Sequence, residues 1–98
     1  MELLTKENFK DKISTGKAIV QFSAEWCGPC KMATPIIEEL SKECDIPAYK
    51  VDTDSQPELT SDHHVMTLPS TVFYNDGAVE AAHVGLAKKE ILKDKFGL

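Results

Sequence analysis

The chain has 98 residues, of which 42% are hydrophobic and 28% are charged, so we expect one domain with its own core, residues 1–98. Sixteen acidic and eleven basic residues give a formal net charge of -5, which argues against nucleic acid or an anionic membrane as a partner. The chain start lacks a basic segment followed by an apolar run, and no stretch approaches the ~20 apolar residues of a membrane span. Since three cysteines also fit a reducing compartment better than a secreted disulfide framework, we expect a cytoplasmic protein.

The first elements expected are a short edge strand at 2–4, a helix over about 5–14 and a strand at 18–24. Thr5 is suited to be the N-cap of this helix, and Phe9 and Ile13 have the spacing of one helix face. The strand at 18–24 is apolar on both faces except at Gln21 and Ser23, which is typical of a central strand covered on both sides.

The segment 26–30, WCGPC, lies where this strand gives way to a helix over about 29–43. The helix is predicted by apolar residues at i, i+3, i+4 and i+7. A proline suits the first turn, whereas Pro35 inside the helix predicts a kink. The helical positions that carry the apolar pattern are Ala33, Ile36, Ile37, Leu40 and Cys44.

The placement of the two cysteines of this segment predicts their chemistry. A cysteine at a helix N-terminus faces unpaired N–H groups and the positive end of the helix dipole, which both favour the thiolate. Cys27 has this position, and Cys30 lies within the first turn, close enough for the two sulfurs to bond. We predict Cys27 as the nucleophile and Cys30 as the resolving thiol of a thiol–disulfide exchange.

The same spacing also supplies half of many zinc sites. The further candidate ligands form no second cysteine pair and no His-x3-5-His pattern, so we expect no metal site. These candidates are Cys44, His63, His64 and His83. We interpret Cys44 as a buried, inert thiol and the neighbouring histidines 63 and 64 as solvated.

The rest of the chain predicts a strand at 47–52 parallel to the central strand, a short helix at 57–64 and a hairpin of 70–74 with 78–84. A last helix, about 88–96, should pack Ile91, Leu92 and Phe96 on the sheet. The pattern indicates an α/β fold, a mixed sheet with helices on both faces. Ligands of such sheets bind beyond the carboxyl ends of parallel strands, where Cys27 lies.

The segment 26–32, WCGPCKM, resembles the active site of the thioredoxin family, and the resemblance extends over nearly the whole chain. Weaker matches follow in the family's order at 4–9, 50–54, 68–70, 75–77 and 84–85. The resemblance implies a thioredoxin fold, with a mixed sheet of four to five strands and about four helices. It also implies a cis peptide bond between Leu68 and Pro69.

The function implied by this resemblance is that of a monomeric protein-disulfide reductase, a thiol-disulfide oxidoreductase of electron transport and cell redox homeostasis. It would need no bound cofactor, and a thioredoxin reductase, expected to be a flavoprotein, would recycle it. Disulfide-containing protein substrates would dock by strand addition. The implied substrate-binding residues are Trp26, Gly28, Pro29, Leu68, Pro69, Val84 and Gly85.

The chain departs from the family at Gln21, which stands where the family has a buried carboxylate near a lysine, here Lys50. We expect both residues to modulate the cysteines. His64 replaces a common glycine, and Ser70 replaces the usual threonine. Two alternatives stay open: a glutathione-coupled glutaredoxin or oxidising isomerase, and a redox-inert binding module that keeps the scaffold.

Overall fold

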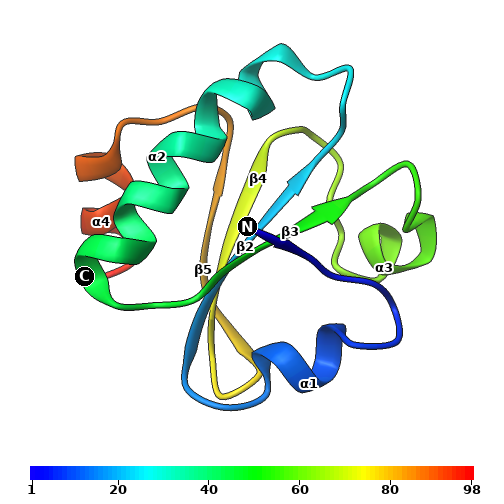
Figure 1. Ribbon diagram of the computed structural model, residues 1–98, viewed down its shortest axis with the longest axis horizontal. Coiled ribbons are helices and arrows are strands. Elements are labelled where there is room, and N and C mark those ends of the chain that lie inside the picture. Colours follow the sequence, from blue (N-terminus) through cyan, green and yellow to red (C-terminus); the bar gives the residue numbers. More distant parts are fainter.

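A five-stranded mixed sheet forms the centre of the structure, a computed structural model that describes residues 1–98 (Figure 1). The strand order is β1-β3-β2-β4-β5; β2 pairs in parallel with β3 and antiparallel with β4. Four helices complete the fold, as the sequence predicts. Along the chain the elements are β1 (Glu2–Leu3), α1 (Phe9–Ile13), β2 (Lys17–Ser23), α2 (Gly28–Cys44), β3 (Ala48–Asp52), α3 (Pro57–Asp62), β4 (Ser70–Asn75), β5 (Ala78–Val84) and α4 (Lys89–Lys95).

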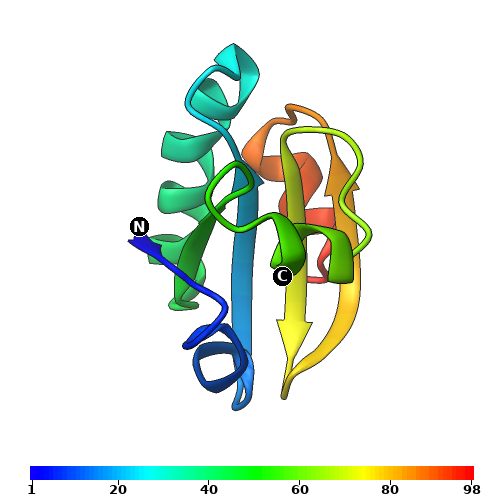
Figure 2. The same ribbon diagram turned by 90° about the vertical axis from the view of Figure 1, so that its right-hand side faces the viewer.

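The helices cover both faces of the sheet, α2 and α4 on one and α1 and α3 on the other (Figures 1 and 2). Successive side chains of β2 point to opposite faces. Val20 and Phe22 therefore join Phe9 in the core beneath α1 and α3, while Ile19 joins Ile37 beneath α2. The apolar run of β2 is buried on both sides because it is the central strand, as predicted.

The longest helix, α2, connects the end of β2 to β3 and continues through Pro35. It buries Ala33, Ile37 and Leu40, three of the five positions that its spacing predicts, and the other two, Ile36 and Cys44, are half-buried. Asp45 ends it in a left-handed conformation with φ 53°. None of the helices combines the length and the hydropathy needed to cross a membrane.

Two predictions about helices are wrong. The first helix begins at Phe9 rather than near Thr5: residues 6–8 form a turn, in which the Asn8 side-chain oxygen accepts a 2.8 Å hydrogen bond from the Thr5 N–H. In α4, Leu92 is buried and Phe96 follows it into the core, but Ile91 is 51% exposed. Only one face of this short helix packs against the sheet, and Ile91 is not on that face.

His63 also differs from the solvated side chain that we expected. Its ring lies 4.6 Å from that of Phe9, between centroids, and its Nδ1 is 3.1 Å from the Tyr74 hydroxyl. Burial is the main cause that lowers the pKa of His63. The neighbouring His64 is exposed, as expected, and has a φ of 56°, a conformation that favours glycine.

Candidate functional site

The two cysteines of the WCGPC segment lie where β2 ends and α2 begins, and this segment is near the top of Figure 1. Cys27 and Cys30 are joined by a disulfide, with 5.3 Å between their Cα atoms. Cys27 is the N-cap of α2, and its sulfur accepts a 3.3 Å hydrogen bond from the Cys30 N–H. The sulfur is thus held by one of the unpaired N–H groups that begin a helix.

Both cysteines are almost buried in this disulfide form, Cys27 at 5% exposure and Cys30 at 2%. The residues around them are exposed: Trp26 at 72%, and Gly28 and Pro29 as well. The disulfide is therefore set just below a surface formed by its own flanking residues.

A second segment, the loop before β4, lies beside the cysteine pair. Leu68 packs against the small cluster formed by Ala24, Cys27 and Cys30, and the Leu68–Pro69 peptide bond is cis, as predicted. The Pro69 carbonyl accepts a 2.8 Å hydrogen bond from the N–H of Gly85, just past the end of β5. A hydrogen bond thus joins the two segments that the resemblance assigns to substrate binding, and one of them packs against the cluster that contains the cysteine pair.

The exposed indole of Trp26 is held in place by the loop after β3. Its Nε1–H donates a 2.9 Å hydrogen bond to a carboxylate oxygen of Asp54. Sequence reasoning placed Asp54 in a family-like stretch without assigning it a role. The contact spans 28 residues of sequence, so no local pattern indicated it.

Gln21 lies directly beneath the first turn of α2 and has no exposed surface. Its side-chain N–H donates to the Cys30 carbonyl oxygen at 3.0 Å, and its side-chain oxygen accepts from the Thr34 hydroxyl at 3.0 Å. Thr34, which the sequence did not single out, is thus a second partner of the amide, and its hydroxyl also lies 3.0 Å from the Cys30 carbonyl oxygen. Lys50 is the residue opposite Gln21 in the neighbouring strand and is half-buried.

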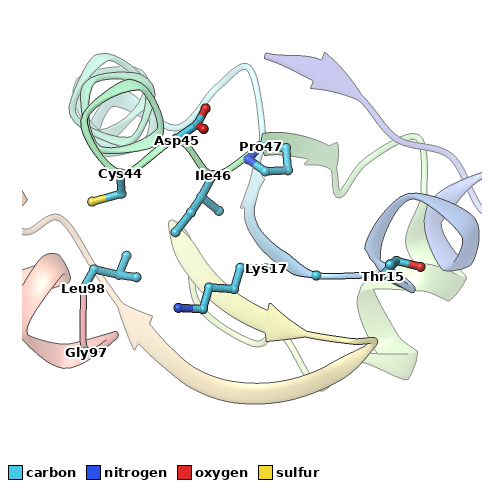
Figure 3. A pocket seen from close by; sticks show the side chains of 9 residues that line it. Thr15, Lys17, Cys44, Asp45, Ile46, Pro47, Gly97 and Leu98 are labelled. Atoms are coloured by element: carbon cyan, nitrogen blue, oxygen red, sulfur yellow. The ribbon is translucent and has the colours of Figure 1, made fainter.

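A cavity of about 670 Å³ lies at the other end of the sheet, where Lys17, Cys44 and Ile46 are among its lining residues (Figure 3). At 1.5 Å per residue the length of α2 separates Cys44 from Cys27 by about 25 Å. The third cysteine therefore takes no part in the disulfide site. It is half-buried rather than buried, against the core beneath α2. The structure contains no group of three or more His, Cys, Asp or Glu side chains able to hold a metal ion.

Comparison with known proteins agrees with this geometry. The family model described as Thioredoxin matches residues 1–96. A thioredoxin of Chlamydia trachomatis is 39% identical over 93 residues, covering 94% of this chain and 91% of that protein. A thioredoxin of Staphylococcus saprophyticus is also 39% identical, covering 93% and 89%. A solved structure of Plasmodium falciparum thioredoxin has a TM-score of 0.88 and 33% identity, covering 99% of this chain and 97% of that one. The chain, with its Cys27–Cys30 pair at disulfide distance, belongs to the thioredoxin family.

Proposed function

We propose that Cys27 is the attacking thiolate and Cys30 the resolving thiol of this thioredoxin-family protein-disulfide reductase. The observation that supports these roles is the position of Cys27 as N-cap of α2, with its sulfur accepting the Cys30 N–H. N–H donors and the positive end of a helix dipole both stabilise a thiolate. Cys30 lies inside the first turn of α2, where a bulky substrate disulfide has poorer access than at the N-cap position of Cys27.

The reaction has two exchange steps. The Cys27 thiolate attacks one sulfur of the substrate disulfide, and the other substrate sulfur leaves as a thiolate. The Cys30 sulfur, having lost its proton, then attacks Cys27, which releases the second substrate thiolate and forms the disulfide seen in the structure. The substrate gains two electrons and the cysteine pair loses two.

Substrate would dock over the surface that surrounds the disulfide. Strand addition needs a fixed backbone edge, and the hydrogen bond from Gly85 to Pro69 fixes the two segments of this edge to each other. The exposed Trp26 gives an apolar contact of the kind that dominates many interfaces. The proposed substrate-binding residues are Trp26, Gly28, Pro29, Leu68, Pro69, Val84 and Gly85, with Gln21 and Lys50 as modulators of the cysteines.

Recycling by a reductase is the standard route of the family, and we propose that a flavoprotein thioredoxin reductase performs it here. We also propose that the chain acts in electron transport as a single-domain monomer in the cytoplasm, with no bound cofactor. Support for its partners being proteins comes from the net charge of -5, which disfavours polyanionic partners.

Reduction of insulin disulfides tests the function. We expect turnover with a thioredoxin reductase and its electron donor, and none when Cys27 is replaced by serine. Turnover with glutathione alone would favour the glutaredoxin alternative, and net oxidation of reduced substrates would favour the isomerase. No exchange under any of these conditions would favour the binding module.

A further inference from the structure

A cavity of about 280 Å³ lies beside Cys30, on the face of the sheet that α2 covers. Its wall includes Cys30 itself, Ser23 of β2, and Lys50 and Asp52 of β3. The space is far larger than the roughly 10–15 Å³ that one water molecule needs, and polar walls favour hydration. Water in this cavity would thus lie next to Cys30, the residue that must lose a proton in the resolving step.

The Ser23 side chain supports this reading of the cavity. Ser23 is only 2% exposed and lines the cavity, and its hydroxyl has no hydrogen-bond partner among the protein's own groups. All side-chain N and O atoms that are fully enclosed do have partners, so this hydroxyl faces the space rather than the packed core. A buried hydroxyl of this kind takes water as its partner.

Gln21 cannot accept the proton of Cys30. Its amide is neutral, its N–H group already donates to the Cys30 carbonyl, and its oxygen accepts from Thr34. The Cys30 proton must therefore go to another acceptor, and a carboxylate that water connects to Cys30 could supply one.

Asp52 is the carboxylate best placed on the cavity wall. It is opposite Ser23 in the parallel ladder, so both side chains project from the same face of the sheet toward α2. It is half-buried, and one of its oxygens accepts the Asp54 N–H at 3.0 Å, which fixes the carboxylate. Glu25 also lines the cavity but is exposed to solvent.

We propose that Asp52 is the proton acceptor of the resolving step and receives the Cys30 proton through water in this cavity. The Cys30 sulfur then bonds to the Cys27 sulfur, the bond from Cys27 to the substrate sulfur breaks, and its electron pair leaves with the substrate thiolate. The proton held by Asp52 passes to solvent at the mouth of the cavity. The proposal rests on the Cys27–Cys30 exchange. It adds a route for the Cys30 proton that does not involve the neutral Gln21.

Stopped-flow kinetics with a fluorogenic disulfide peptide separates the two steps, because attack by Cys27 depends on peptide concentration and resolution does not. Asp52→Asn keeps the oxygen that accepts from Asp54. We expect it to leave the attack rate constant unchanged and to slow resolution roughly tenfold or more at neutral pH. Resolution in the variant should then rise about tenfold per pH unit below the thiol pKa, because only pre-formed thiolate reacts. In the unmodified protein the rate constant of resolution should depend less steeply on pH.

Glu25→Gln is the matched control, since it removes a carboxylate from the same cavity wall at an exposed position. It should leave both steps and the pH profile unchanged. The proposal is overturned if Asp52→Asn keeps the rate and pH profile of resolution, or if Glu25→Gln changes them equally. Absence of a concentration-dependent attack step in the unmodified protein would instead contradict the exchange function itself.

Discussion

The side chain of Gln21 donates a 3.0 Å hydrogen bond to the backbone carbonyl of Cys30, so a neutral amide occupies the place directly beneath the resolving cysteine. A carbonyl oxygen offers no proton, so a group at position 21 that is to bond it must be a donor. Glutamine meets this need, whereas an ionised carboxylate there would face the carbonyl oxygen with negative charge and no proton to share. The arrangement makes position 21 a direct probe of charge under the disulfide.

Gln21→Asp should destabilise the protein at neutral pH by about 2–4 kcal/mol relative to Gln21→Asn, because burial raises the pKa of an unpaired carboxyl. The folded state then binds the extra proton more tightly than the unfolded chain. The destabilisation should therefore be absent below a pH of about 4 and grow as the pH rises to the folded pKa. Urea unfolding over this range measures it.

The matched Asn and Asp variants have nearly the same shape and differ in charge. Gln21→Asp should also add a second titration to the Cys27 profile and leave turnover equal or faster, since it supplies a base near Cys30. Equal stabilities of the two variants, with a single-step Cys27 titration in both, would contradict a buried carboxylate beneath the cysteines.

The strands of the sheet could be predicted from the sequence, because the signals that indicate them are local. The apolar run of β2, the helical spacing of α2 and the Asn75-Asp76-Gly77 turn each depend on residues close in the chain. The bounds of β2, α2 and the two strands joined by this turn lie within two residues of the predicted ones. The cysteine pair was also predicted from local sequence, because both cysteines lie at the N-terminus of α2 and the helix start itself determines their chemistry.

The missed features depend on contacts between distant segments. Trp26 and Asp54 meet across 28 residues, and His63 meets Tyr74 across 11. The turn that precedes α1 contains a bond from the Thr5 N–H to the side-chain oxygen of Asn8, which is likewise a side-chain contact. Helical and strand periodicity does not encode such contacts, so the partners of the site residues required the structure.

Cys30→Ser should leave the attack by Cys27 intact and trap mixed disulfides with substrates, because only the second step needs the Cys30 sulfur. Cys27→Ser should trap none. Non-reducing electrophoresis measures the trapped species. Alkylation of the reduced protein, mapped by mass spectrometry, checks the same assignment: labelling of Cys30 or Cys44 ahead of Cys27 would show that the roles are wrongly assigned.

Asp54→Ala should lower kcat/KM for protein disulfides about two- to tenfold, through KM, because the Trp26 indole loses the hydrogen bond that orients it; such bonds contribute about 0.5–1.5 kcal/mol. A small disulfide reagent should react as before. Asp62→Ala removes an exposed carboxylate with no contact to Trp26 and serves as the charge control.

A Trp26→Phe background tests the same contact, since phenylalanine has no N–H to donate. Asp54→Ala should have no further effect there. An undiminished effect would mean that Asp54 acts on substrates by charge rather than through the indole.

The packing of His63 predicts how stability depends on pH. Burial against Phe9 and Phe22 lowers the pKa of His63 more than the neighbouring Asp62 raises it, and His64 lowers it further. The unfolded chain then binds the proton more readily than the folded protein. The stability contributed by neutral His63 is fully present above the pKa of the unfolded chain, about 6.5. It is lost as the pH falls through the pKa of the folded protein.

The midpoint of urea unfolding should therefore decrease between about pH 7 and pH 5, and His63→Phe should flatten this decrease. His64→Gln removes an exposed histidine and should leave the decrease in place. His83 needs its own control, because burial first and Lys95 second lower its pKa as well. The measurement is therefore made in a His83→Gln background, where an unchanged slope after His63→Phe would show that protonation of His63 does not oppose folding.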